Sequence, residues 1–269
     1  MLIPVSGLIF VFVILLGLIY FFVPDNIDNF LSVQNLKTIL KQTVIVGIGA
    51  MAMTVIIVSG GIDLSAGSVV ALTAVFCAHC VNWLNGDIVV LGIFPIPILF
   101  SVFVGAFIGF INGTISARLN IAPFIVTLGM MLIARGLAEG VAEQSVVRTP
   151  DNWLKTLMMR EPALEWLVFA PGVWVNVILF LVTMLLLRCS VFGRYVFAIG
   201  ANEQAAKFSG INVTKQKILI YTLGGAMFGL AGVMSYAEIG DGDPTTAVAL
   251  ELDIIAAVVI GGASLAGGR

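Results

Sequence analysis

Charged residues are scarce in this sequence. Asp, Glu, Lys and Arg make up 10% of the 269 residues, whereas 60% are hydrophobic, and the net charge is −2. Soluble domains contain about 25% charged and about 45–50% apolar residues, so this composition excludes a soluble fold. The slightly negative charge also argues against a nucleic-acid partner. We therefore predict an integral membrane protein in contact with lipid.

Residues suited to metal, nucleotide or covalent chemistry are also few. The chain has one histidine, His79, beside Cys77 and Cys80. The two cysteines share a helix face that His79 does not, so we expect core packing there and no metal site. No glycine-rich loop ends in the Gly-Lys-Ser/Thr of a phosphate-binding loop, and no nucleophile, base and orienting group occur together. We therefore predict that the chain is not an enzyme and binds no cofactor itself.

Apolar runs of membrane-spanning length recur along the chain. Because they are continuous rather than alternating, they predict helices and exclude a β-barrel. We expect an all-α, polytopic transmembrane bundle that forms a single domain over residues 1–269. The predicted spans, about eight in all, lie near 4–23, 43–59, 66–82, 93–115, 121–140, 166–187, 216–237 and 252–267.

Glycines recur at helix-packing spacing in two of these runs. Gly105, Gly109 and Gly113 lie four residues apart, as do Gly225 and Gly229. Such spacing lets two helices approach closely in lipid. Small residues are nevertheless common in all spanning helices, so either reading fits a single motif.

The segment 188–217 is the most basic connection between spans. Excess Lys and Arg mark cytoplasmic loops, so we place this segment in the cytoplasm and the loop at 141–165 outside. This count puts Lys37 and Lys41 outside as well, and we expect them on an interfacial segment, balanced by Asp25 and Asp28. The basic residues of 188–217 are Arg188, Arg194, Lys207, Lys215 and Lys217, against one acid, Glu203.

A polar stretch at 59–68 interrupts two apolar runs with three glycines, serines and Asp63. Irregular backbone at membrane depth is tolerated only inside protein or along a water-filled cavity, so a broken or re-entrant segment is predicted. Asp63 is either a functional group or the N-terminal cap of the next helix. The polar or aromatic residues at such breaks, our candidates for the lining of a solute pathway, are Asp63, Ser65, Asn112, Phe124 and Thr127.

A second distinctive segment follows Gly200. Asn202 is a plausible helix N-cap, residues 203–208 predict a short helix, and Gly210 is expected to end it. A short helix between two spans on the cytoplasmic side is well placed to dock another protein. An ordinary amphipathic loop helix is the alternative.

Together these segments resemble the permease subunits of bacterial ATP-driven (ABC) importers of the ribose, xylose, galactoside and autoinducer-2 class. The order and spacing of the motifs fit the family pattern, and they spread over most of the chain past residue 40. The matching stretches are Ser59–Ser68, Asn112–Gly113, Ala122–Gly129, Phe192–Ile211 and Glu251–Gly262.

The resemblance implies a subunit that moves a monosaccharide or sugar-like solute across the bacterial inner membrane by alternating access. It implies three partners: a second permease subunit, identical or similar; a cytoplasmic tandem ATPase that holds ATP and Mg; and a periplasmic sugar-binding protein. The shared motifs do not name the sugar. The ATPase-coupling residues that it implies are Gly200, Asn202, Glu203, Ala205, Ala206, Ser209 and Gly210.

Two further expectations follow. Family members run on past residues 267–269 with further spans, so the resemblance implies about ten spans in an untruncated protein and a C-terminal truncation here. The alternative function is an ion-coupled secondary transporter of a small polar solute, a class with broken helices and intramembrane charges. Asp63, Arg135 and Glu139 would then carry the coupling.

Overall fold

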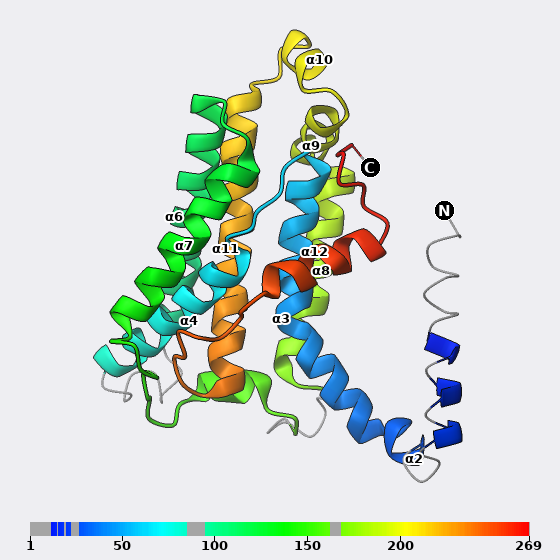
Figure 1. Cartoon of the computed structure of the whole chain (residues 1–269), viewed down its shortest axis with the longest axis vertical. Coiled ribbons are helices and arrows are strands. Elements are labelled where there is room, and N and C mark those ends of the chain that lie inside the picture. Colours follow the sequence, from blue (N-terminus) through cyan, green and yellow to red (C-terminus); the bar gives the residue numbers. More distant parts are fainter. Residues whose placement is uncertain are drawn as a thin grey trace.

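The protein is a bundle of helices, shown by a computed structural model (Figure 1). Within the described residues the one β-type contact is a single bridge between Val147 and Gly242. The structure describes residues 12–14, 16–18, 20–22, 27–84, 95–161 and 168–268.

Six helices of the described residues are long and apolar enough to cross a membrane. They coincide with six of the predicted runs, so the all-α, multi-spanning prediction is confirmed. The six are α3 (Val33–Val58), α4 (Ala66–Trp83), α6 (Ile96–Leu119), α7 (Pro123–Val141), α8 (Pro171–Cys189) and α11 (Val213–Ile239). Shorter helices lie between and beside them: α2 (Ile27–Phe30), η2 (Trp153–Met158), α9 (Val191–Ala201), α10 (Glu203–Phe208) and α12 (Leu250–Ile260).

The predicted count of about eight spans is not supported, because the run at 252–267 does not form a spanning helix. The helix there, α12, has 11 residues, or about 16 Å of length, roughly half of a bilayer core. It ends at Gly261 and Gly262, and Gly262 has a φ of 101° that stops a right-handed helix. Composition alone did not reveal this stop. The predicted span at 4–23 and the side chains of Asp25 and Asp28 lie largely or wholly outside the described residues.

Helix α3 begins ten residues before the predicted start. The Ser32 hydroxyl accepts a hydrogen bond from the Asn35 backbone amide at 3.1 Å, which caps the helix. Lys37 and Lys41 therefore lie in the first turns of α3, and their position at the membrane interface stays a prediction. The Lys41 ammonium lies 3.6 Å from the carboxylate of Glu238 at the end of α11.

The predicted close packing of glycine-rich helices is confirmed where α6 crosses α11. A methyl group on Gly109 would lie 3.1 Å from Gly225 Cα, and one on Gly105 would lie 2.8 Å from Gly229 Cα. Side chains larger than hydrogen would force the two backbones apart. Helix α11 also packs against α3 and α4, so it forms the centre of the bundle.

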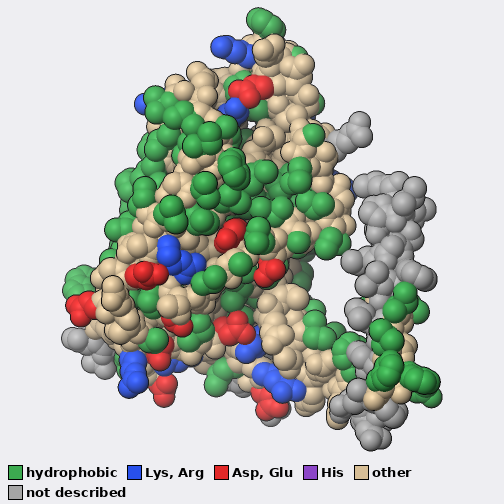
Figure 2. Space-filling model, in the orientation of Figure 1, with side chains coloured by type: hydrophobic (Ala, Val, Ile, Leu, Met, Phe, Trp, Pro, Cys, Tyr) green, Lys and Arg blue, Asp and Glu red, His purple; other side chains and the backbone are tan. Residues whose placement is uncertain are grey.

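The two ends of the bundle differ (Figure 1). Helices α9 and α10 and the residues after α12 lie at one end, which we call the α10 end. The 141–161 segment and the end of α11 lie at the opposite end. On the face drawn in Figure 2, charged side chains lie near the α10 end, toward the opposite end and in a group at mid-height, and hydrophobic side chains cover much of the surface between them.

Candidate functional site

The polar stretch after α3 is a break inside the bundle. Helix α3 ends at Val58, Gly60 has a φ of 84°, and α4 begins at Ala66. The connecting residues run from the α10 end back toward the middle of the bundle (Figure 1). Asp63, in this connection, is 1% exposed. The structure thus has the predicted break, and it is enclosed by protein.

Asp63 organises the start of α4. Its carboxylate accepts hydrogen bonds from the Ser65 amide at 2.8 Å and from the Ser65 hydroxyl at 2.6 Å. The Asn112 amide nitrogen on α6 donates to the same hydroxyl at 3.1 Å, while the buried Asn112 Oδ1 has no partner. The Ser65 amide lies before the first residue of α4, and the N-cap residue is Ser65, which makes no side-chain cap hydrogen bond. Asp63 therefore closes a local side-chain turn just ahead of α4, and the predicted N-cap role of Asp63 is not found.

Thr127 joins this cluster from α7. Its hydroxyl accepts from the Leu64 amide at 3.1 Å, and it contacts the Ile62 carbonyl at 3.4 Å. Phe124 does not join it, since its side chain is 50% exposed on the outer face of α7. Four of the five predicted pathway residues therefore lie together, and the fifth points elsewhere.

The segment after α9 has the predicted local structure. The Asn202 side chain accepts from the Ala205 amide at 2.9 Å and caps α10. The helix ends at Ser209 and Gly210, and Gly210 has a φ of 84°. The Ser209 hydroxyl donates back to the Ala205 carbonyl. The expected cap and stop are both confirmed.

Helix α10 is attached to α11 and exposes an aromatic ring. Ala206 is buried in a small core with Ile199 and Val213, and Glu203 forms an ion pair with Lys217 at 2.7 Å. Phe208 is 89% exposed at the end of the helix. An anchored helix that presents a large exposed hydrophobic side chain has the features of a docking element.

Gly200 connects this segment to the break. A methyl group on Gly200 would overlap the Val58 carbonyl and lie 2.7 Å from the Gly268 amide nitrogen. The Gly268 amide donates to the Val58 carbonyl at 2.9 Å, and a methyl on Gly267 would lie 2.9 Å from Gly60 Cα. The end of α9, the end of α3 and the residues after α12 therefore meet backbone to backbone. We call this contact the glycine junction.

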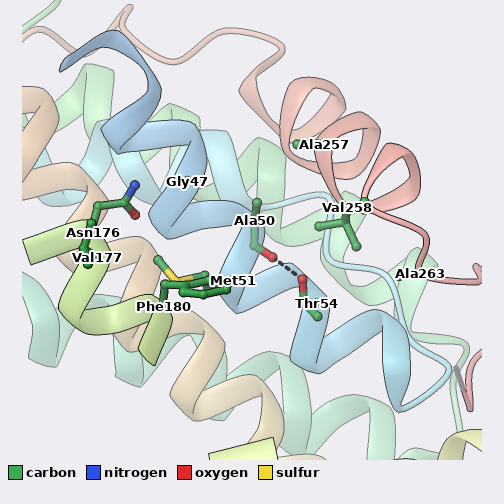
Figure 3. Close-up of a pocket in the computed structure, with 11 residues that line it drawn as sticks. Gly47, Ala50, Met51, Thr54, Asn176, Val177, Phe180, Ala257, Val258 and Ala263 are labelled. Carbon is green, nitrogen blue, oxygen red and sulfur yellow. Dashed lines mark hydrogen bonds between the residues drawn. The ribbon is translucent and has the colours of Figure 1, made fainter. Parts of the chain in front are cut away.

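A cavity of about 420 Å³ that is open to the surface lies between α3, α8 and α12, and its lining residues Val177 and Phe180 are exposed (Figure 3). Its wall is mostly apolar, with the Asn176 amide and the Thr54 hydroxyl as polar groups. Asn176 points from α8 toward α3, and its buried Oδ1 has no partner. The lining residues are Gly47, Ala50, Met51, Thr54, Asn176, Val177, Phe180, Ala257, Val258, Gly261 and Ala263.

The sequence analysis did not predict this cavity, and none of the five predicted pathway residues lines it. One feature of the sequence did indicate a polar site in α8. Asn176 is the only strongly polar side chain between Pro171 and Thr183. A polar residue inside a spanning helix is expected to face the protein interior or a cavity.

Comparison with known proteins adds the family. Residues 35–268 match the model of the family described as "Branched-chain amino acid transport system / permease component". The chain belongs to this family. It is a permease subunit of an ABC importer and a multi-pass protein of the inner membrane.

Several curated relatives of this permease are named for sugars. The ribose import permease of Escherichia coli K12 is 39% identical over 241 residues, which are 90% of this chain and 73% of the relative. The L-arabinose ABC transporter permease of Azospirillum brasilense is 36% identical over 98% of this chain and 73% of the relative. The fructose import permease of Rhizobium meliloti is 36% identical over 90% and 66%. No solved structure gives a significant match.

The family membership decides between the two predicted functions in favour of the importer. Two residues of the ion-coupled alternative, Asp63 and Arg135, have other contacts in this permease. Arg135 donates to the carbonyls of Pro244 and Thr246 at 2.7 and 2.8 Å and holds the loop before α12. In that loop Ala247 has a φ of 57°, a conformation that costs roughly 1–2 kcal/mol in a residue with a side chain. Arg135 therefore stabilises a strained loop.

Proposed function

We propose that this permease imports a monosaccharide or similar polyol across the inner membrane, driven by ATP hydrolysis on a separate subunit. The capped, exposed helix α10 is the observation that supports the link to that subunit. The names of the relatives, which are permeases for ribose, arabinose and fructose, support the cargo.

The proposal places ATP and Mg on a tandem ATPase partner. The chain has no phosphate-binding loop of its own. The α10 end is placed in the cytoplasm, because the 188–217 segment has five basic residues against Glu203. Phe208, at the tip of α10, then faces the ATPase and supplies a hydrophobic anchor. A few such residues carry most of the binding energy of a protein–protein interface.

Coupling runs through the glycine junction in this proposal. Movement of α10 is passed to α9, because Asn202 alone separates the two helices. Gly200 of α9 contacts the Val58 carbonyl at the end of α3, so it transmits the movement to α3 and the break at once. Backbone contacts of this kind transmit displacement well, since no side chain can rotate away to absorb it.

The pathway lies beside the break in this proposal. Asp63, Ser65, Asn112 and Thr127 hold the connection between α3 and α4, and the free Asn112 Oδ1 supplies a hydrogen-bond acceptor there. A second permease copy completes the pathway. A periplasmic sugar-binding protein docks at the opposite end, where Glu238 and the loop that follows α11 lie.

A branched-chain amino acid is a second candidate cargo, because the family description itself names this class of solute. Uptake of labelled leucine against labelled ribose separates the two. Saturable, binding-protein-dependent uptake of leucine and not of ribose would reassign the cargo and leave the importer architecture unchanged.

The test is purification of the permease from its native membrane in several mild detergents. We expect an ATPase to co-purify with the parent protein and with Phe103→Ala, which removes a similarly exposed ring from α6. We expect its loss from Glu203→Arg and Phe208→Ala. Absence of any ATPase from the parent in all detergents would contradict the proposal. Retention by both α10 variants would remove α10 from the interface.

A further inference from the structure

We propose that the cavity between α3, α8 and α12 is a binding site for a small neutral polyhydroxylated solute, with Asn176 as its principal hydrogen-bonding residue. This inference rests on the proposed function, since it gives the imported solute a binding site in addition to the pathway beside the break. The site differs from the Asp63 cluster, whose residues do not line the cavity.

The size and composition of the cavity suit such a ligand. Its volume of about 420 Å³ lies within the range of roughly 300–1,000 Å³ typical of small-molecule sites. Such sites are mostly apolar with a few placed polar groups. Here Met51 and Phe180 supply apolar surface for C–H faces, and Asn176 and Thr54 supply the polar groups.

The capacity of the Asn176 and Thr54 side-chain oxygens to accept hydrogen bonds is unused. The Asn176 Oδ1 is buried without a partner and can accept a bond from a solute hydroxyl. The Thr54 hydroxyl donates to the Ala50 carbonyl at 2.7 Å, which leaves its oxygen free to accept (Figure 3). A buried polar group without a partner is destabilising. A ligand with several hydroxyls relieves this cost by hydrogen-bonding to it, whereas a lipid chain does not.

Gly47 sets the position of the amide. A methyl group there would lie 2.6 Å from Asn176 Nδ2 and 2.9 Å from its Oδ1. The three atoms nearest to the added methyl all belong to the Asn176 side chain, so an alanine at position 47 would push the amide away. Gly47→Ala therefore tests whether the amide must be correctly positioned, whereas Asn176→Leu tests whether an amide is needed at all.

Two walls of the cavity connect to the glycine junction. Helix α3 runs from Gly47 and Thr54 to Val58, and the residues after α12 run from Ala263 to Gly268. Val58 and Gly268 are hydrogen-bonded to each other beside Gly200. A displacement of α9 therefore moves both walls, which links the affinity of the cavity to the state of the coupling segment.

The experiment measures protection of a cysteine in the cavity. Cys77, Cys80 and Cys189 are replaced by Ala, and Val177→Cys is alkylated by maleimide in native membranes with and without ribose, arabinose or fructose. Ile178→Cys, exposed on α8 outside the cavity, is the control. At a sugar concentration of twice the Kd, alkylation of Val177→Cys should slow about threefold, and that of Ile178→Cys should not change.

Two variants, each combined with Val177→Cys, test the role of Asn176. Asn176→Leu and Gly47→Ala should each abolish protection, while Gly136→Ala, where no atom lies within 4 Å of the added methyl, should keep it. Protection of neither cysteine by any of the sugars overturns the inference, as does protection that survives both Asn176→Leu and Gly47→Ala. Reaction of Val177→Cys only with lipid-soluble reagents also overturns it, because a lipid then fills the cavity. If ATP-driven uptake persists in these cases, the proposed function stands without this site.

Discussion

Replacing Gly200 by alanine should weaken the protein and uncouple it. The added methyl overlaps the Val58 carbonyl and lies 2.7 Å from the Gly268 amide nitrogen. These are backbone atoms, so no rotamer change relieves the overlap, and α9 must move away from α3. Overpacking costs about 1–3 kcal/mol, and loss of the 2.9 Å bond from Gly268 to Val58 costs about 0.5–1.5 kcal/mol. Against this, alanine gains up to about 1 kcal/mol in a helix.

The expected net loss is therefore about 0.5–4 kcal/mol. Gly136→Ala is the matched control, because its methyl meets open space in α7, and it should gain about 0.5–1 kcal/mol. Thermal unfolding of the detergent-solubilised protein should shift in opposite directions for the two variants. In membranes, Gly200→Ala should retain ATPase binding and lose most sugar uptake. A Gly200→Ala protein as stable and as active as Gly136→Ala would refute the glycine junction.

Three further changes have defined outcomes. Gly109→Val should lower the unfolding temperature by overpacking the α6–α11 crossing, at a cost of about 1–3 kcal/mol, while Gly136→Val should lower it much less, because position 136 is open. Asn202→Ala should weaken α10 by about 1 kcal/mol and reduce ATPase retention in the pull-down, whereas restored capping by Asn202→Asp should recover it; equal retention by all three proteins would contradict this. Asp63→Ala should destabilise the start of α4 and impair uptake at equal expression; unchanged uptake would remove Asp63 from the mechanism.

Local signals in the sequence predicted local structure well. The cap at Asn202 and the stop at Gly210 depend on neighbouring backbone groups alone, and the structure has both. The spacing of Gly105 and Gly109 marked one face of a helix, and that face meets the glycines of α11. In each case the interactions that determine the structure act within a few residues or along one helix face.

Features that depend on tertiary packing could not be read in the same way. Helix α12 is as apolar as a spanning helix, and its stop at Gly262 is a conformational property that hydropathy does not record. Phe124 follows a break, yet the packing of α7 turns its ring outward. The cavity lies between α3, α8 and α12, which are far apart in sequence, so its lining residues could be identified only from the fold. The pathway and coupling roles of individual residues stay predictions.

The central claim is that this permease moves a sugar at the expense of ATP. The most direct test is uptake of labelled ribose, arabinose or fructose into proteoliposomes that contain the permease with its co-purified ATPase, with binding protein outside and ATP inside. We predict uptake that requires ATP and the binding protein, persists when ion gradients are dissipated, and is lost in Phe208→Ala. Uptake that proceeds without ATP and collapses with the ion gradient would contradict the account.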